Sequence, residues 1–243
     1  MRGIYSDKTE GYLNFASTSS EGTTSIYNGA DVTPSGFNAT GNGGWWANNG
    51  SGTYIYMAIR RPHKKPQTGT EVYKSYRYAG SGSQVYRTVS FPVDALLTQR
   101  TSSGNPYFLD RMRGGYQYQL TASNNNEGTQ TTAIHYFGND FIKMSSGAVI
   151  NASGNDYLIH TFKRAPGFFD IVAYEGNGSS RVISHNLEVA PELLITKCRS
   201  DSNTDWLAGF TDTGKWYKLD SSNGYQGNLS NYYTSITSTG YTI

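Results

Sequence analysis

Histidine and cysteine are the residues of this sequence best suited to nucleophilic catalysis or metal binding. The four histidines are His63, His135, His160 and His185, and the single cysteine is Cys198. No two histidines have the spacing that places a pair of metal ligands on one face of a helix, and no Cys-x-x-Cys pair occurs. Cys198 ends an apolar run and has no partner for an internal disulfide, so we expect a small, buried hydrophobic side chain. These residue types therefore predict neither a metal site nor a cofactor.

Acidic residues could supply the two carboxylates of a glycosidase. Asp94 and Glu192 occupy equivalent positions near the start of predicted strands, and Asp110 follows the next loop. Nothing in the sequence brings two of them together, so we interpret them as turn caps and solvated side chains. The polar loop Ser123–Glu127 lacks the spacing of an EF-hand and is predicted to be a solvated hairpin tip. The sequence predicts no enzyme and no catalytic residue, although a glycan-degrading activity stays open as an alternative.

Two short glycine motifs, Gly80-Ser-Gly82 and Gly176-Asn-Gly178, resemble fragments of phosphate-binding loops. Each motif lacks the third glycine and the following helix that such loops use to hold a phosphate group. A pair of glycines between two strand-length segments instead favours a hairpin turn. We therefore predict two hairpins at these motifs.

Adjacent aromatic residues are more informative about binding. Trp45-Trp46, Trp216-Tyr217 and Tyr232-Tyr233 are such pairs, and on a strand the two members of a pair point to opposite faces. An exposed aromatic ring on a β-sheet can stack on a sugar ring. The predicted glycan-binding residues are aromatic residues and nearby amides, namely Trp45, Trp46, Asn48, Asn49, Trp216 and Tyr217. Packing in a core or in a subunit interface is the alternative for these rings.

The composition indicates β structure and a weakly charged surface. Glycine (28 residues) and tyrosine (20 residues) are abundant, and only 16% of the residues are charged. A net charge of +2 gives no electrostatic reason to expect binding to nucleic acid or to an anionic membrane. No apolar run approaches the roughly 18 residues of a membrane-spanning helix, so we expect no membrane insertion.

An internal repeat of about 100 residues organises the chain, and such a repeat has to be recognised before the fold is assigned. The motif Tyr-Ala-Gly-Ser-Gly at residues 78–82 recurs as Tyr-Glu-Gly-Asn-Gly at residues 174–178. Tyr54 and Tyr157 begin two further matching segments, and each segment ends in basic residues and a proline. Proline cannot donate a hydrogen bond to a sheet, so each segment is predicted to be a strand with a defined end.

The repeat also assigns other segments. Two apolar runs, Phe168–Glu175 and Leu193–Cys198, are of strand length, and we predict a strand for each. Asp94–Arg100 corresponds to the second run and is predicted to be a strand too. His160 has Met57 as its counterpart, so packing explains this histidine better than catalysis does. His185 is interpreted as a turn residue by the same comparison.

Three parts of the chain follow from the repeat. Residues 1–62 form a partial β unit (the second part of a repeat), residues 63–166 a complete β-sandwich unit, and residues 167–243 another partial unit (the first part of a repeat). The polar link His63–Pro66 marks the first boundary. We predict an all-β fold of tandem antiparallel β-sandwich-like units of about 100 residues. Each partial unit leaves a sheet edge unpaired, so we expect a longer polypeptide or completion of one partial unit by the other, within or between chains.

Several stretches of the later units carry a family resemblance: Phe168–Gly178, Ser184–Lys197, Asp205-Trp206, and Asn151–Gly154 with Tyr157. They resemble a repeat domain of tailed-bacteriophage tail and fibre virion structural proteins, notably those of marine phages. The resemblance covers nearly the whole chain, and its motifs are structural. The middle unit departs from the pattern at Phe91-Pro92, where the third unit has its His-Asn-Leu turn.

The resemblance implies a bacteriophage virion structural protein, most simply part of a tail fibre or tail adhesin involved in host attachment. The implied location is the virion tail, which is extracellular, and the implied partners are other virion tail proteins. A capsid-surface or baseplate decoration protein and a glycan-degrading tail enzyme are the alternatives. We also expect a homo-oligomer, because a tyrosine-rich, weakly charged composition is typical of interface cores. The resemblance to fibre proteins, which are commonly trimeric, implies that a trimer is favoured. The aromatic candidates point to a host surface polysaccharide as the ligand.

Overall fold

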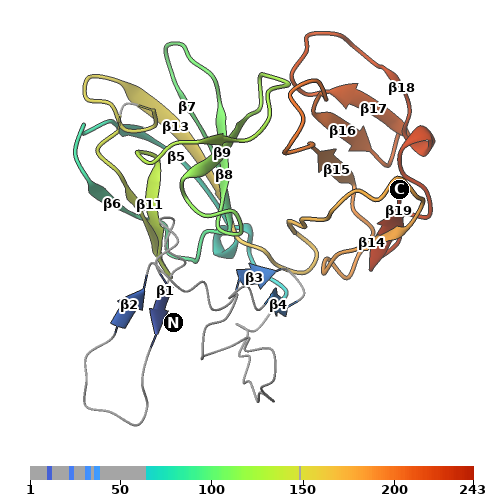
Figure 1. Ribbon diagram of the computed structural model, residues 1–243, viewed down its shortest axis with the longest axis horizontal. Helices are drawn as coiled ribbons and strands as arrows, with labels where there is room; N and C mark the ends of the chain where they lie inside the picture. The colour runs from blue at the N-terminus through green and yellow to red at the C-terminus, as the bar shows by residue number, and fades with distance from the viewer. Residues whose placement is uncertain (1–9, 13–21, 25–30, 34–35, 39–63, 148) are drawn as a thin grey trace.

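The computed structural model describes residues 10–12, 22–24, 31–33, 36–38, 64–147 and 149–243 (Figure 1). Within these ranges the regular structure consists of β-strands and two short 3-10 turns, at Gly69–Glu71 and Leu229–Asn231. All strand pairings in the described part are antiparallel. The prediction of an all-β fold with a sandwich-like character is therefore confirmed.

The first lobe contains two antiparallel sheets. A six-stranded sheet has the order β10-β9-β8-β7-β13-β5, and a three-stranded sheet has the order β11-β12-β6. The nine strands are β5 (Tyr73–Ala79), β6 (Val85–Thr88), β7 (Ala95–Arg100), β8 (Tyr107–Asp110), β9 (Gln117–Leu120), β10 (Gly128–Thr129), β11 (Ile134–Phe137), β12 (Phe141–Met144) and β13 (Asp156–Phe162). Asp94–Arg100 and the segment after Tyr157 were predicted to be strands, and both predictions are confirmed.

Side chains from both sheets of the first lobe meet in one core, because each strand alternates inward and outward residues. Along β13, Tyr157, Ile159 and Thr161 are buried, and the residues between them are less so. Ile134 and Ile142 reach the same core from the smaller sheet. Burying an aliphatic side chain of this size stabilises a fold by about 1.5–3 kcal/mol, so this core accounts for the lobe's cohesion.

The second lobe lies beside the first (Figure 1) and contains a pair of strands and a four-stranded sheet. The pair is β14 (Val182–Ser184) with β19 (Gly240–Thr242). The sheet has the order β15-β16-β17-β18, formed by β15 (Leu193–Thr196), β16 (Leu207–Phe210), β17 (Lys215–Lys218) and β18 (Gly227–Asn228). A smaller core fills this lobe, and its buried members are Ile183, Leu229, Tyr233 and Tyr241.

Strand pairing follows the sequence repeat. β1 (Glu10–Tyr12) pairs with β2 (Gly22–Thr24) as β9 pairs with β10, and β3 (Asp31–Thr33) pairs with β4 (Gly36–Asn38) as β11 pairs with β12. In the second lobe, β14 pairs with β19 as β6 pairs with β12, and the order β15-β16-β17-β18 matches β7-β8-β9-β10. The described strands of this lobe include no counterpart of β13 or β5. The division of the chain at residues 62 and 166 stays a prediction, and His63 lies outside the described residues.

The predicted strand at Phe168–Glu175 does not form. This segment makes only an isolated bridge, between Ala165 and Phe169, and is otherwise irregular. Its counterpart in the first lobe, β5, is held in place by seven residue pairs with β13. The described part of the second lobe contains no strand equivalent to β13. Phe168–Glu175 therefore has no neighbouring strand with which to form backbone hydrogen bonds.

The glycine motifs are not hairpin turns. Gly80–Gly82 connects β5 in the larger sheet of the first lobe to β6 in the smaller one. Gly80 is needed there because a Cβ atom would lie 2.0 Å from the carbonyl oxygen of Ala152. Gly176–Gly178 lies in the loop before β14, a strand that pairs with β19 near the end of the chain. Both motifs therefore serve connections between sheets.

Cys198 is exposed, contrary to the prediction that it is buried. It falls two residues beyond the end of β15, in a loop, and the apolar run therefore ends before it. Its thiol lies 3.7 Å from the Ser200 hydroxyl, and this hydrogen bond lowers the pKa of the Cys198 thiol. The residue is consequently a surface thiol.

Two sets of contacts join the lobes. Trp206 of the second lobe is 5% exposed, donates from its indole nitrogen to the Leu120 carbonyl (2.9 Å) and meets Phe108 edge-on. Beside it, Arg199 of the second lobe pairs with Glu127 of the first (2.8 Å). We call these five residues the lobe junction. Since they combine a buried indole with a partly buried ion pair, they hold the lobes in a defined arrangement.

The carboxylate of Glu127 makes this junction sensitive to pH. Partial burial raises the pKa of Glu127, but hydrogen bonds from Arg199 and Arg113 outweigh it, so the net pKa lies below its usual value. A carboxylate with a lowered folded-state pKa stabilises the fold above its unfolded-state pKa of about 4.3, and this stabilisation is lost as the pH falls through the folded-state value. Asp170, which pairs with Arg164 where the first lobe leads into the second, also has a lowered pKa and acts in the same sense.

We therefore expect the free energy of unfolding, measured with urea, to be constant between pH 7 and about pH 5 and to fall below about pH 4. Glu127→Gln is expected to cost about 1.5–3 kcal/mol at pH 7, because it removes charge-assisted hydrogen bonds, and to reduce this acid dependence. The matched control is Glu188→Gln, in an exposed loop. A Glu127→Gln protein with unchanged stability and an unchanged acid profile would show that the ion pair is inconsequential.

Candidate ligand-binding surface

The four-stranded sheet of the second lobe has one face on the core and one face in solvent. Leu194 on β15 and Trp216 on β17 pack against the core of the lobe. Because β15–β16 and β16–β17 are paired in register, the alternate residues share the other face. This outer face is formed by Leu193, Ile195, Ala208, Phe210, Lys215 and Tyr217, of which Ala208 is covered by its neighbours and buried.

Three aromatic rings lie in a row on this face. The Phe210 and Tyr217 ring centroids are 5.7 Å apart and nearly perpendicular (84°), and Tyr225 follows at 6.4 Å from Tyr217. Phe210 is 40% exposed and Tyr225 is 50% exposed. We call Phe210, Tyr217 and Tyr225 the outer aromatic row. Perpendicular packing lets neighbouring rings support one another and leaves ring surface open to solvent.

Polar groups accompany the row. The Lys215 ammonium lies 5.2 Å from the centroid of the Tyr225 ring, and the Tyr225 hydroxyl donates to Oδ1 of Asn228 (2.9 Å). Asn228 pairs with Lys215 across β17 and β18 and is itself exposed. The surface therefore combines flat apolar rings with an ammonium group and an amide, which are the kinds of groups that contact the faces and hydroxyls of sugars.

The aliphatic part of the same face is also open. Leu193 lies directly across from Phe210 and is 45% exposed, and Ile195 on the same strand is 49% exposed. Contiguous apolar patches are uncommon on soluble monomers, and they mark contact sites more often than single exposed residues do. The outer face is thus a candidate contact surface along most of its length.

Of the predicted glycan-binding residues, the structure describes two. Tyr217 lies on the outer face as the middle ring of the outer aromatic row. Trp216 lies on the inner face, where its ring meets Tyr232 edge-on at 5.0 Å, and its buried indole nitrogen has no hydrogen-bond partner. The pair Trp216-Tyr217 is therefore divided between the two faces. The remaining candidates lie outside the described residues, namely Trp45, Trp46, Asn48 and Asn49.

Sequence reasoning missed Phe210, Lys215 and Tyr225. A signal was present for the first two, because the hairpin formed by β16 and β17 places Phe210 directly opposite Lys215. A tight turn at Asp212-Thr213-Gly214 would have indicated this register. Tyr225 precedes β18, and its approach to Tyr217 follows only from the tertiary structure.

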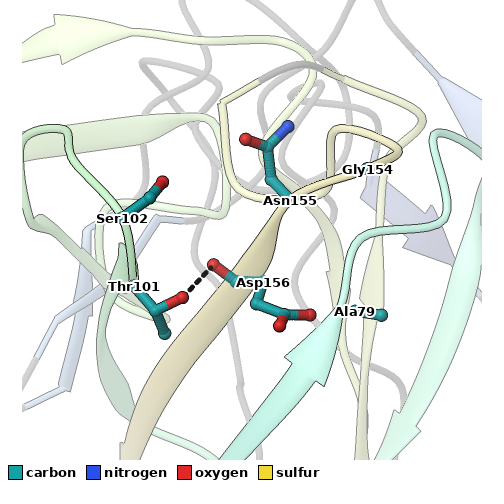
Figure 2. Close-up of a pocket in the computed structure, with 6 residues that line it drawn as sticks. All are labelled: Ala79, Thr101, Ser102, Gly154, Asn155 and Asp156. Carbon is teal, nitrogen blue, oxygen red and sulfur yellow. Dashed lines mark hydrogen bonds between the residues drawn. The ribbon is translucent and has the colours of Figure 1, made fainter.

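Hollows also lie elsewhere on the described surface. The first, of about 400 Å³, is lined by Ala79, Thr101, Ser102, Gly154, Asn155 and Asp156. Figure 2 shows that the side chains of Asn155 and Asp156 point in different directions, and the Thr101 hydroxyl donates to the Asp156 carbonyl oxygen (3.3 Å). The Asp156 carboxylate is paired with Arg77 (3.1 Å). This hollow contains one carboxylate, whereas glycosidic hydrolysis requires a pair.

The second hollow, of about 440 Å³, lies in the second lobe between the loop that carries Gly176–Gly178 and the segment around Tyr232. Its lining residues include amides, hydroxyls and the 46% exposed Tyr232 ring, and no Asp or Glu side chain is among them. This hollow offers one aromatic ring, whereas the outer aromatic row offers three.

Two of the acidic residues considered as catalytic candidates, Asp94 and Asp110, have structural partners. Asp94 and Asp110 are both buried, so the prediction of solvated side chains was wrong for these two. Asp110 accepts the backbone N–H of Arg113 (2.9 Å), which is the predicted capping role, and also pairs with the Arg113 guanidinium. Asp94 lies 3.4 Å from the guanidinium of Arg111. The prediction of a solvated hairpin tip was also wrong for Glu127, because this residue belongs to the lobe junction.

The two histidines discussed from the sequence pack against tyrosines. His160 stacks on Tyr73, and its Nδ1 atom is 2.7 Å from the Tyr73 hydroxyl. His185 is buried beside Tyr241. Among the described residues, no cluster of three or more His, Cys, Asp or Glu side chains could hold a metal ion. Over the same residues, no helix is long and apolar enough to cross a bilayer.

The described chain thus belongs to the all-β class, with antiparallel sheets in two lobes and an exposed aromatic face on the second. Residues 68–243 match a sequence family described as a domain of unknown function (DUF7483), and the chain belongs to this family. The match spans both lobes and the lobe junction. No curated protein and no solved structure matches the chain.

Proposed function

We propose that this chain is a structural, non-enzymatic component of a tailed-phage virion, in a tail fibre or tail adhesin that contacts the host. In this proposal its ligand is a host surface polysaccharide, and its binding surface is the outer aromatic row with Lys215 and Asn228. The resemblance of Phe168–Gly178 and Ser184–Lys197 to phage tail repeats supports the placement in the virion tail.

The observation that carries the binding role is the exposure of Phe210 and Tyr225 beside an ammonium group and an amide. Aromatic rings bury apolar area at a small cost in side-chain entropy, because each ring has only two rotatable bonds. Sugars present apolar C–H faces and hydroxyl groups, and they fit such a surface without ion pairs. The low charge of the chain agrees with a neutral ligand.

The partners expected in this proposal are other copies of the chain, with a trimer favoured, and other virion tail proteins. The exposed leucine and isoleucine of the outer face support assembly, since contiguous exposed apolar side chains mark contact sites. No nucleic acid and no cofactor takes part in the proposed role.

Removal of rings from the outer aromatic row tests the binding role. Phe210→Ala and Tyr225→Ala are each expected to weaken binding to extracted host polysaccharide roughly two- to twelve-fold, which corresponds to about 0.5–1.5 kcal/mol per ring. Because both side chains are substantially exposed, the thermal midpoint should hardly change. Calorimetry against the polysaccharide and thermal denaturation of the same samples provide the measurements.

The matched control is Tyr86→Ala. Tyr86 is 62% exposed and also packs edge-on against a phenylalanine, Phe141, but it lies on β6 of the first lobe. Its removal should leave polysaccharide binding unchanged. Equal losses for Tyr86→Ala and Tyr225→Ala, or no loss for either variant of the row, would refute the assignment of this surface.

A further inference from the structure

β15 is an edge strand where the first lobe has an interior strand. Among the described strands, β15 has a single neighbour, β16, and ends the order of its sheet. β7, which occupies the same position in the first lobe, is paired on one side with β8 and on the other with β13. Among the described strands, the outer edge of β15 therefore lacks the neighbour that β13 gives to β7.

Two hydrogen bonds establish that β7 and β15 are equivalent. The carbonyl of Asp94, just before β7, accepts the N–H of Arg111 (2.8 Å), and the carbonyl of Glu192, just before β15, accepts the N–H of Thr211 (3.0 Å). In addition, Thr196 on β15 accepts a hydrogen bond from the hydroxyl of Tyr233. Thr98 on β7 likewise lies within hydrogen-bonding distance of the Tyr78 hydroxyl. Residues 94–98 therefore align with residues 192–196.

The aligned residues differ in exposure. Ala95 is completely buried and its counterpart Leu193 is 45% exposed, while Ile195, the counterpart of the half-buried Leu97, is 49% exposed. The inward residues of β15 are likewise less buried than those of β7. An open strand edge with exposed β-branched and leucine side chains is a template for pairing with another strand.

We propose that the outer edge of β15 binds an antiparallel strand from a second copy of this chain, and that residues 54–59 of that copy are the strand. The sequence from Tyr54, Tyr-Ile-Tyr-Met-Ala-Ile-Arg-Arg, has the pattern of the β13 sequence from Tyr157, Tyr-Leu-Ile-His-Thr-Phe-Lys-Arg. Residues 54–59 lie outside the described residues, and only their sequence enters here. Strand addition of this kind takes its affinity from main-chain hydrogen bonds and its specificity from alternate side chains.

A backbone hydrogen bond of the first lobe supports this occupant. In the first lobe, the Asp94 carboxylate accepts the backbone N–H of Arg164, just after β13 (2.8 Å). Glu192 stands at the position of Asp94, is exposed, and has no described residue paired with its carboxylate. With Tyr54 aligned to Tyr157, Arg61 aligns with Arg164. The donated strand therefore brings the backbone N–H of Arg61 to the exposed Glu192 carboxylate, as β13 brings that of Arg164 to Asp94.

The order of the repeat favours a second copy as the source. In the first lobe, β13 completes its own unit before the chain continues into the second lobe. By the same order, residues 54–59 belong to the unit that precedes the first lobe, while β15 belongs to the unit that follows it. A second copy placed head to tail continues this order of units. A head-to-tail contact of this kind generates rings or filaments.

Disulfide trapping tests the contact and its register. β13 pairs with β7 through His160 and Leu97, so Met57 of one copy should face Ile195 of the other. We expect a Met57→Cys chain mixed with a tagged Ile195→Cys chain, both in a Cys198→Ser background, to form a mixed disulfide on mild oxidation. The control is Met57→Cys mixed with Leu194→Cys, because a one-residue shift turns the side chain to the other face. This control should give several-fold less product.

Three outcomes would overturn the proposal. They are equal yields from Ile195→Cys and Leu194→Cys, no mixed disulfide, and a cross-link that forms only within the single chain carrying both Met57→Cys and Ile195→Cys. Excess unlabelled peptide of residues 52–62 should lower the yield of the expected product. Circular dichroism of each cysteine variant establishes that it is folded. None of these results depends on polysaccharide binding, so this proposal and the proposed function can fail separately.

Discussion

Replacement of Trp206 by alanine is expected to release the second lobe from the first. The indole is 5% exposed, meets Phe108 edge-on and donates to the Leu120 carbonyl, so its removal leaves a cavity and an unpaired carbonyl. Loss of a buried tryptophan costs about 3–5 kcal/mol when the surroundings do not close over the space. The Arg199–Glu127 ion pair remains, but the Arg199 side chain is 50% exposed. Because exposed ion pairs contribute little free energy, this pair cannot replace the contacts of the indole.

In urea denaturation, the wild-type protein should unfold in a single transition. Trp206→Ala should unfold in two transitions, one for each lobe. Limited proteolysis should cut the variant faster near residues 163–171, the segment that links the lobes. Trp206→Phe is the matched control, because it keeps an aromatic ring against Phe108 and removes only the N–H donor. A Trp206→Ala protein that unfolds in one transition with unchanged stability would contradict the description of the lobe junction.

Tyr157→Ala is expected to have an effect of similar size within the first lobe. The Tyr157 ring is completely buried at the centre of the core and stacks on Tyr78 at a centroid distance of 5.2 Å. Its hydroxyl accepts hydrogen bonds from the backbone N–H of Ala152 (3.0 Å) and from Nε of Arg100 (3.3 Å). Removal of the whole side chain should cost about 3–5 kcal/mol, by analogy with other large buried aromatic residues.

Tyr157→Phe separates the two contributions. It keeps the ring and removes the acceptor of a partly buried backbone N–H, which should cost about 1–3 kcal/mol. The measurement is the midpoint of urea denaturation, followed by fluorescence and circular dichroism on the same samples. The expected order of stability is wild type, Tyr157→Phe, then Tyr157→Ala. Equal stability of wild type and Tyr157→Ala would mean that this ring does not organise the core.

Much of the strand content could be predicted from the sequence because many strands have a recognisable local pattern of apolar and polar residues. The segment from Tyr157 alternates buried and less buried residues, and the run from Leu193 is short, apolar and bounded by polar residues. Both form strands. Phe168–Glu175 has an equally good local pattern and forms none. A strand needs a partner as well as a pattern, and the partner is supplied by residues far away in the sequence.

The candidate surface could be predicted only in part for the same reason. Alternation along β17 required Trp216 and Tyr217 to point in opposite directions, but it could not say which of them faces the core. Tyr225 joins the row through a loop, and no local periodicity places it beside Tyr217. Cys198 illustrates the converse error, since an apolar run in the sequence extends two residues beyond the strand that it forms.

Immunogold electron microscopy of virions that carry this chain tests the central claim most directly. An antibody against residues 64–243 would be applied to intact particles, with particles lacking the protein as the control. The proposal that this chain is a tail fibre or tail adhesin component predicts gold label confined to the tail. Label on the capsid surface, or intact virions without label, would contradict it.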